Sequence, residues 1–293
     1  MTLFNAIYNY STLTELVEYY LNNVVKGNYA DSTYKSYKAR LENHVLPEIG
    51  DIKVKNLTKM DVQNLIFSLK NQANPLSGNT IRLVRSILNG VLDFAVDMDI
   101  IDKNVADRII LPKQAKYQPR IYTNIEIQNL LQVAKDTNLY LPILLAVKVG
   151  LRRSEILALQ WKDIDFKNKT ISVTKTTRER TLCYPKTRNS CRCLQLPDIV
   201  ISALRGHWFY QYDVLGDLVN VVSKGRNSPY NPSYISRSFN ELLRANALQS
   251  IRFHDLRHTY ATHAYSNGMS IKDLSASLGH NSAATTLDNY VHV

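Results

Sequence analysis

The spacing of apolar and polar positions predicts helices along most of the N-terminal third of the chain. Residues 12–15, Thr-Leu-Thr-Glu, form a capping-box sequence, and apolar residues follow it at the spacing of one helical face. Residues 58–61 repeat the capping arrangement, and Pro47 with Gly50 marks the break before it. The pattern therefore predicts helices near 12–25, 32–44, 58–72 and 78–98.

Beyond residue 112 the pattern changes. The stretch 113–122 lacks periodicity and carries Pro119 among basic residues, which predicts a linker. The remaining segments are predicted, in chain order, as helices over 124–149, a tight hairpin over 165–173, a second strand pair over 181–197 with its turn at 187–190, and helices from 198 onward. We expect a mostly α protein with a small antiparallel β-sheet, divided into an N-terminal tail (1–11), a helical domain (12–112), a basic linker (113–122) and an α+β domain (123–293).

Composition and charge narrow the class of partner. Hydrophobic residues make up 45% and charged residues 21% of the 293 residues, which excludes a disordered chain. Lys and Arg total 36 against 25 Asp and Glu, and this net charge of +11 indicates a polyanionic binding partner. A basic soluble protein without such a partner would show the same net charge. Residues 1–116 contain 14 basic and 12 acidic residues, so the second half of the chain carries most of the excess.

The sequence gives no indication of a membrane or of secretion. Between Asp136 and Lys148 lie eleven uncharged residues, well short of the ~20 that span a bilayer. The opening segment lacks the basic start and apolar core of a signal peptide. The cysteines, Cys183, Cys191 and Cys193, lack the spacing of a metal knuckle and are interpreted as reduced thiols. We expect a cytoplasmic protein with no membrane partner.

Two basic segments are candidates for contacts to nucleic acid. The predicted helix from Ser32 interleaves lysines with tyrosines, which suits a phosphate backbone and base edges but also suits a solvated helix face. The predicted strands around residues 175–192 carry basic residues against the single acid Glu179, which suits a DNA groove or a row of phosphates, or else a solvated hairpin. The basic residues of this hairpin are Lys175, Arg178, Arg180, Lys186, Arg188 and Arg192. The candidate DNA contacts in the whole chain are Lys35, Lys38, Arg82, Arg85, Lys175, Arg178, Arg180, Arg188 and Arg237.

Two further segments carry residue types suited to phosphate chemistry. The segment GLRRSEILAL puts Arg152 and Glu155 three apart on one helical face, which would be a surface salt bridge if the segment stood alone. The segment LGHNSAATTLDNYVHV places His280 at the helix break and Tyr290 ten residues later. A lone tyrosine is seldom a nucleophile, so only the other segments support Tyr290 as a candidate nucleophile.

The segment FHDLRHTYAT puts His254 and Arg257 on one helical face. An imidazole and a guanidinium side by side repel each other if both are charged, so the pair indicates a site in which an anion binds between them. His258 adds an H-x-x-x-H spacing, with Asp255 second, that resembles the zinc-protease pattern H-E-x-x-H. The zinc motif requires a Glu base, and Arg257 would bring a cation close to the metal, so a metal-dependent hydrolase is the weaker hypothesis.

Taken together, these segments resemble the tyrosine recombinase (phage integrase) family, most closely the integrases of mobile elements in Gram-positive bacteria. The resemblance extends from about Thr12 to Val293. Its signature is an Arg in G-L-R-x-x-E, a Lys in a β-hairpin, H-x-x-R, L-G-H and a C-terminal Tyr, all present here in order. The family's catalytic roles then carry over to Arg152, Lys186, His254, Arg257, His280 and Tyr290, with Glu155 as a support residue. Lys175 is the alternative to Lys186, which is favoured by its P-K-T setting.

The resemblance implies a site-specific recombinase for integration or excision of a mobile element. Its fold would be an N-terminal helical core-binding (SAM-like) domain plus a C-terminal catalytic domain, forming a clamp around DNA. The activity would cleave and rejoin DNA through a 3'-phosphotyrosine intermediate and a Holliday junction, with no metal, ATP or other cofactor. Its partners would be double-stranded DNA with inverted-repeat core sites and a homo-tetramer on two DNA sites, with accessory excision or bending proteins, in the bacterial cytoplasm at the nucleoid. The alternative is a non-catalytic DNA-binding protein of the same fold that occupies recombination sites.

The sequence departs from the family in three places. Only about eleven residues precede the first predicted helix, so we expect no N-terminal arm-binding module, either in a two-domain enzyme or in a truncated chain. Only Val291 to Val293 follow Tyr290, where relatives carry a longer tail that docks onto the neighbouring protomer. The segment 218–231 fits poorly with the strand and turn that the family places before its last helices.

Overall fold

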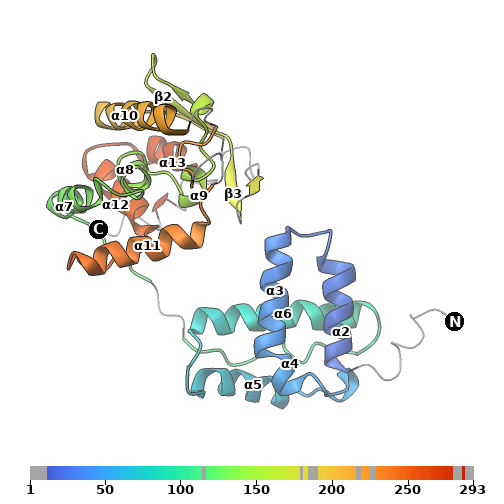
Figure 1. Ribbon diagram of the computed structural model, residues 1–293. Coiled ribbons are helices and arrows are strands. Elements are labelled where there is room, and N and C mark those ends of the chain that lie inside the picture. The colour runs from blue at the N-terminus through green and yellow to red at the C-terminus, as the bar shows by residue number, and fades with distance from the viewer. Residues whose placement is uncertain are drawn as a thin grey trace. The chain divides into compact units, whose positions relative to one another are not determined.

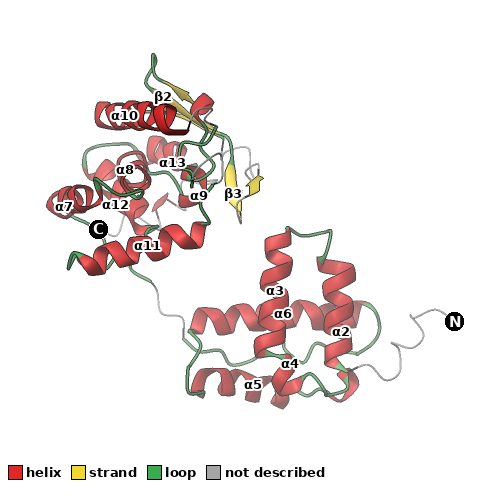
Figure 2. Ribbon diagram, in the orientation of Figure 1, coloured by secondary structure: helices red, strands yellow, loops and turns green. Residues whose placement is uncertain are grey.

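The computed structural model divides the chain into two compact units, Met1–Tyr117 and Gln118–Val293 (Figure 1). It describes residues 12–113, 117–178, 181–183, 191–215, 219–224, 229–279 and 286–287. These residues are mostly helical, and their strands are short and antiparallel (Figure 2). The predicted fold class, mostly α with a small antiparallel sheet, is therefore confirmed. Over the same residues, no helix is both long enough and apolar enough to cross a bilayer.

The first unit is built from helices that begin where the capping sequences predict. Thr12 and Glu15 exchange hydrogen bonds of 2.9 and 3.3 Å in a capping box, and Thr58 and Asp61 do the same at 2.9 and 3.2 Å. The predicted helix 12–25 is divided into an α-helix and a π-helical turn, Leu21–Val25. The α-helices are α2 (Leu13–Tyr20), α3 (Asp31–His44), α4 (Leu46–Ile49), α5 (Lys59–Asn71) and α6 (Gly78–Asp97), and a 3-10 turn covers Val54–Asn56.

The core of the first unit is organised along α6. Ile81, Val84, Leu88 and Val91 are fully buried and repeat at spacings of three and four, so one face of α6 packs against α2, α3 and α5. The polar side of α6 holds the segment that follows it. Arg82 donates a hydrogen bond to the carbonyl of Pro112 at 2.7 Å, and Arg85 donates two to the carbonyl of Ala106 at 3.0 and 2.8 Å.

The second unit packs its helices around α8. Residues from Leu141 to Val147 of this helix are all buried, because α8 lies among α7, α10 and α12 (Figure 1). A helix that is apolar on every side must be covered on every side, so α8 is the centre of this core. The helices are α7 (Asn124–Ala134), α8 (Tyr140–Val149), α9 (Arg153–Ile156), α10 (Asp198–Leu215), α11 (Pro232–Ala245), α12 (Asp255–Ser266) and α13 (Ile271–Leu278), with a 3-10 turn at Trp161–Asp163.

The strands confirm one predicted hairpin and correct the other. The hairpin over 165–173 is present, but the prediction that residues 181–197 pair with each other around a turn is wrong. The strand that begins at Thr181 pairs with the one before it, and the strand that begins at Arg192 pairs with the first hairpin. The strands are β1 (Ile164–Asp165), β2 (Thr170–Val173) and β5 (Arg192–Gln195) in one sheet, ordered β1-β2-β5, and β3 (Thr176–Arg178) and β4 (Thr181–Cys183) in another.

Burial explains this pairing. Ile171 and Val173 of β2 face the core, with exposed fractions of 0% and 3%. The register places Leu194 opposite Ile171 and Arg192 opposite Val173, so β5 extends the face that covers the core. Local alternation cannot specify which strand is the partner, and the tertiary core selects it.

The segment 218–231, which departs from the family pattern, runs partly alongside the end of the α9 region. The backbone N–H of Val221 donates to the carbonyl of Leu159 at 2.9 Å, and that of Trp161 donates to the carbonyl of Val219 at 3.0 Å. Val221 is fully buried. The segment therefore contributes to the core of the second unit.

Gly150 is the point at which α8 and α12 come into direct contact. It ends α8 in the left-handed conformation, with φ of 73°, and a Cβ there would lie 2.4 Å from Cδ1 of Tyr260 on α12. No side chain fits without moving the aromatic ring or the backbone. The carbonyl of Gly150 is thereby held at a fixed position over α12.

We predict that Gly150→Ala destabilises the second unit by roughly 2–4 kcal/mol, because it combines left-handed strain with a steric clash. Gly206→Ala in α10 is the matched control, since nothing lies within 4 Å of its Cβ position. That control should leave stability unchanged or raise it by up to about 1 kcal/mol. Urea unfolding followed by circular dichroism measures both, and equal stabilities of the two variants would contradict the packing described.

Candidate active site

The structure brings together the predicted site residues that it describes. Arg152, Glu155, His254 and Arg257 lie where the first turns of α9 and α12 approach each other. The other predicted catalytic residues, Lys186, His280 and Tyr290, lie outside the described residues, as do Arg180 and Arg188. The described part of the site therefore consists of Arg152, Arg257, Glu155 and His254.

Glu155 is the buried centre of this site. Its side chain is 6% exposed, and it occupies the third position of α9. Oε2 accepts a hydrogen bond from the backbone N–H of Arg152 at 2.8 Å, which caps the helix, and Oε1 accepts one from Nη1 of Arg152 at 2.8 Å. The sequence spacing of Arg152 and Glu155 is explained by this one-turn helix, in which Arg152 is the N-cap.

A second arginine, Arg192 of β5, binds the same carboxylate. Nη1 donates to Oε1 of Glu155 at 3.0 Å and Nη2 donates to Oε2 at 2.9 Å, a two-point pair in which both side chains are 6% exposed. From sequence, Arg192 is predicted only as one of the basic hairpin residues, and this contact is not predicted. The signal that would have found it is strand alternation, because Arg192 lies on the core side of β5 together with Leu194, but using that signal requires the strand pairing.

Arg257 is a third arginine close to the carboxylate, and it is almost completely buried. Its side chain is 2% exposed, and Nη1 lies 3.9 Å from Oε2 of Glu155. Nη1 donates to the carbonyl of Gly150 at 2.7 Å, and Nη2 donates to the carbonyl of Leu278 at 2.5 Å. A buried guanidinium needs hydrogen-bond acceptors as well as a counter-charge, and these carbonyls supply them. We call Arg152, Arg192 and Arg257 the arginine cluster.

The arginine cluster also binds three consecutive carbonyls at the C-terminal end of α13. Nε of Arg192 donates to Ser277 at 2.6 Å, Nη2 of Arg257 to Leu278 at 2.5 Å, and Nη2 of Arg152 to Gly279 at 3.1 Å. The last carbonyls of a helix have no partner within the helix and carry its negative dipole end, so they attract cations. The end of α13, directly before His280, is therefore fixed by the same residues that surround Glu155.

The electrostatics of Glu155 follow from these contacts. Burial alone would raise its pKa, but the hydrogen bonds and charge of Arg192, followed by the charges of Arg152 and Arg257, lower the pKa from 4.5 to about 2. Glu155 is therefore ionised at neutral pH. Its negative charge offsets part of the positive charge of the arginine cluster.

His254 is held neutral. It precedes the first residue of α12, and its ring packs edge-on against that of His258 with a centroid distance of 5.4 Å. His254 is exposed at the pocket, but partial loss of its water shell, then the proximity of His258 and Arg257, lowers its pKa from 6.5 to about 4. An uncharged imidazole at neutral pH can accept a proton or donate its own N–H to a phosphate oxygen.

The zinc-protease interpretation gains no support from the geometry. Asp255 is fully buried, and its carboxylate pairs with Arg252 at 3.1 Å. Among the residues that the structure describes, no group of three or more His, Cys, Asp or Glu side chains is arranged to hold a metal ion.

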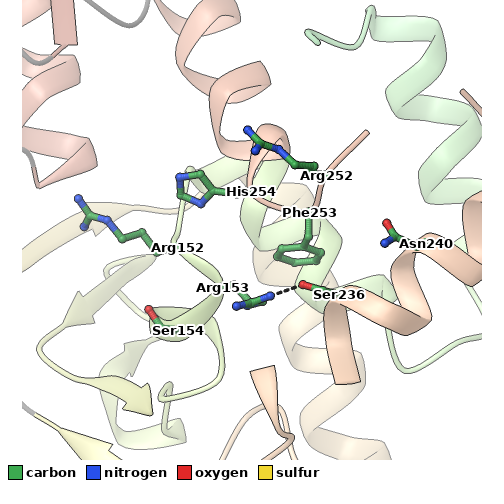
Figure 3. Close-up of a pocket in the computed structure, with 8 residues that line it drawn as sticks. All are labelled: Arg152, Arg153, Ser154, Ser236, Asn240, Arg252, Phe253 and His254. Carbon is green, nitrogen blue, oxygen red and sulfur yellow. Dashed lines mark hydrogen bonds between the residues drawn. The ribbon is translucent and has the colours of Figure 1, made fainter. Parts of the chain in front are cut away.

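A pocket of about 530 Å³ opens beside Arg152 and His254, and Figure 3 shows both side chains directed to the same side of it. Arg153 points to the other side and donates a hydrogen bond to Ser236 of α11. The positive charge of this lining, with a neutral imidazole, suits an anion. The lining residues are Arg152, Arg153, Ser154, Ser236, Asn240, Arg252, Phe253 and His254.

The candidate DNA contacts in the second unit occupy different environments. Nζ of Lys175 donates to Oε1 of Gln160 at 2.8 Å, so this lysine is held inside its own unit. Arg237 is exposed on α11, and Arg178 lies in β3.

The candidates in the first unit are held by partners of their own. Lys35 pairs with Asp31 at 2.8 Å and Lys38 with Glu42 at 3.6 Å, and all four side chains are exposed. Arg82 and Arg85 make the backbone hydrogen bonds described above. Exposed ion pairs are worth only ~0–1 kcal/mol, so a phosphate can displace the partner of Lys35 or Lys38 more easily than that of Arg82 or Arg85.

Comparison with known proteins gives a consistent result. Residues 120–293 match the phage integrase family, and residues 12–70 match the phage integrase N-terminal SAM-like domain. A tyrosine recombinase XerC-like protein of Caldanaerobacter subterraneus subsp. tengcongensis is 27% identical over 312 residues, covering 96% of this chain and 79% of its own. The ICEBs1 integrase of Bacillus subtilis is 23% identical over 280 residues, covering 92% and 74% of the two chains.

Solved structures share the fold. The Tn1549 transposon integrase in complex with a circular intermediate DNA has a TM-score of 0.83 at 20% identity, covering 96% of this chain and 95% of its own. A lambda integrase tetramer bound to a Holliday junction has a TM-score of 0.74 at 20% identity, covering 93% and 78%. The high TM-scores show that the fold is shared. At 20% identity they do not identify the site residues of this chain.

We predict that Glu155 makes stability depend on pH in the acid range. A carboxylate with a depressed pKa stabilises the folded state fully above its unfolded pKa of about 4.5, and this contribution is lost as the pH falls towards 2. The difference in unfolding free energy between wild type and Glu155→Gln should therefore shrink by roughly 2 kcal/mol between pH 6 and pH 3. Urea unfolding at a series of pH values measures it, and a constant difference would contradict the ion-pair network.

We also predict that His254 titrates near pH 4 in the free protein. Two-dimensional NMR of the imidazole nitrogens follows the titration, and His254→Asn identifies the resonance. His258→Asn should raise the pKa of His254, because it removes a neighbouring positive charge, but should leave it below 6.5, because burial remains the largest cause. Titration of wild-type His254 near 6.5 would show that the ring is solvated.

Proposed function

The chain belongs to the phage integrase family and is a tyrosine recombinase, and from that premise we propose that Tyr290 attacks a DNA phosphate activated by Arg152 and Arg257. The observation that carries the proposal is the meeting of these two guanidiniums at the buried Glu155, with His254 beside Arg152 in a cationic pocket. The event cleaves one DNA strand and stores the bond energy in a 3'-phosphotyrosine. The same site later rejoins the strand to a new partner, for integration or excision of a mobile element.

The phenol of a tyrosine is a poor nucleophile at neutral pH, because its pKa is ~10. It needs a proton acceptor and a phosphorus atom made electrophilic. A neutral imidazole at position 254 supplies an acceptor or a hydrogen-bond donor, since its pKa is lowered to about 4. If His254 were charged, it could not accept the proton.

The arginines address the charge that develops on the phosphate. A guanidinium is a planar fork that remains charged and can bind non-bridging oxygens at two points. The side chain of Arg152 is 31% exposed beside the pocket, whereas that of Arg257 is 2% exposed behind it. We assign Arg152 the more direct contact with the phosphate and Arg257 a contact from the buried side. Donors held in place before the reaction stabilise the transition state without reorganising.

The remaining roles rest on the resemblance. Lys186 is assigned as the acid that protonates the departing 5'-oxygen, and His280 as a further donor to the phosphate. The bond from phosphorus to the 5'-oxygen breaks as the bond to the tyrosine oxygen forms, which leaves a free 5'-hydroxyl. The step proposed requires neither ATP nor a metal, because the cationic side chains provide the charge stabilisation.

The assembly follows from the relatives. The lambda integrase structures hold a dimer on a core site and a tetramer on a Holliday junction. We propose that this chain likewise binds double-stranded DNA with inverted-repeat core sites and exchanges strands as a tetramer on two sites, with accessory proteins, at the bacterial nucleoid. Residues 12–112 would be the core-binding domain, 113–122 the linker and 123–293 the catalytic domain.

We predict that the protein forms a covalent DNA adduct that depends on Tyr290. Wild type, Tyr290→Phe and the control Tyr210→Phe are incubated in EDTA with nicked suicide duplexes from a partly randomised library and run on denaturing gels. Tyr210 is exposed on α10, so its variant should trap DNA like wild type. Tyr290→Phe should form no adduct while DNA binding persists.

Either of two results would contradict the proposal. An adduct in Tyr290→Phe would refute the nucleophile. DNA binding without any adduct in wild type would favour a non-catalytic protein that occupies recombination sites.

A further inference from the structure

Arg192 has no assigned role in the proposed chemistry, yet it binds Glu155 at the centre of the site directly. It donates to both oxygens of Glu155 and to the carbonyl of Ser277. We propose that Arg192 is a positioning residue of the active site, which orients Glu155 and the end of α13 so that Arg152 and Arg257 are held for the phosphate. The inference rests on the proposed function of those two arginines.

The burial of Arg192 separates it from the residues that can meet DNA. Its side chain is 6% exposed, against 31% for Arg152. Arg192 does not line the pocket in which Arg152 and His254 meet. A guanidinium in this position acts through its neighbours.

The geometry of the carboxylate shows how Arg192 acts on Arg152. Each oxygen of Glu155 accepts one hydrogen bond from Arg192 and one from Arg152, at distances of 2.8–3.0 Å. The two-point grip of Arg192 fixes the plane of the carboxylate. The acceptor sites of a carboxylate lie in its plane, so this fixed plane also determines the direction from which Nη1 of Arg152 can donate to Oε1.

Arg192 also acts through the end of α13, and this second effect extends to Arg257. Successive helical residues are turned by about 100°, so the carbonyls of Ser277, Leu278 and Gly279 need separate donors. Arg192 holds the first of them, Arg257 the second and Arg152 the third. If Arg192 were lost, the end of α13 could shift and displace the acceptors of both other arginines.

Charge balance also predicts that loss of Arg192 slows the chemical step. With Arg192 present, the negative charge of Glu155 is matched by an arginine that does not line the pocket. Without it, the carboxylate would attract Arg152 and Arg257 more strongly and oppose their reach towards a phosphate. The expected result is a slower chemical step with little change in DNA binding.

The test compares Arg192→Lys, which keeps the charge without the fork, and Arg192→Met, which keeps the bulk without the charge. Nicked suicide duplexes selected by the wild-type protein are the substrate, and the single-turnover rate of adduct formation is measured at saturating protein. We expect both variants to slow the rate by roughly 10–100-fold while the Kd stays within about 3-fold. Wild-type rates in both variants would overturn the proposal.

Two controls exclude other roles for Arg192. Leu204→Ala removes a fully buried side chain of α10 in the same unit, and should lower the Tm while the rate stays within about 3-fold. A similar rate loss in Leu204→Ala would reduce Arg192 to a stabilising residue. A series of Kd values against salt excludes a direct contact, because losing a phosphate contact would reduce the slope by about 1 and losing a positioning residue would not.

A double-variant cycle tests whether Arg192 acts through Arg152. Arg152→Ala together with Arg192→Met should lose less activity than the product of the two single losses, because part of the role of Arg192 disappears with Arg152. Fully multiplicative losses would show that the two residues act independently.

A readout without DNA separates failure of this inference from failure of the proposed function. In protein labelled with ¹⁵N-arginine, the Nε–H signals of Arg152 and Arg257 are assigned by substitution and compared between wild type, Arg192→Lys, Arg192→Met and Leu204→Ala. We expect both signals to shift or broaden in the Arg192 variants alone. Unchanged signals would overturn the positioning role, whatever the outcome of the adduct assay.

Discussion

A carboxylate removed from water has to be compensated by hydrogen-bonded cations, and in this protein that requirement organises the catalytic domain. Glu155 is 6% exposed and is satisfied by Arg192 and by the side chain and backbone of Arg152, with Arg257 at 3.9 Å. Removing any partner would leave part of a buried charge uncompensated. Because those partners belong to β5, α9 and α12, one ionised side chain determines how separate segments of the chain meet.

The same network leaves a local excess of positive charge. Glu155 faces three guanidiniums, and these also donate hydrogen bonds to the backbone carbonyls of Gly150 and residues 277–279. Dipoles of the backbone can orient a guanidinium without cancelling its charge. A phosphate bound at Arg152, as proposed above, would therefore meet donors that are already aligned, because they are ordered when the chain folds.

Local features of the fold could be predicted from sequence, and features decided by tertiary burial could not. The capping boxes at Thr12 and Thr58 and the spacing of Arg152 from Glu155 act within one helical turn, so the sequence alone reveals them. The partner of β5 depends on which face covers Ile171, and the pairing predicted for residues 181–197 was wrong for that reason. The inward position of Arg192 depends on the same packing, so it does not follow from residue type or spacing.

The three arginine-bound carbonyls make the end of α13 sensitive to chain length. Inserting or deleting one residue within Ile271–Leu278 would turn the helix end by about 100° and carry each carbonyl away from its guanidinium. Natural length variation in proteins that keep this network should therefore be absent from α13.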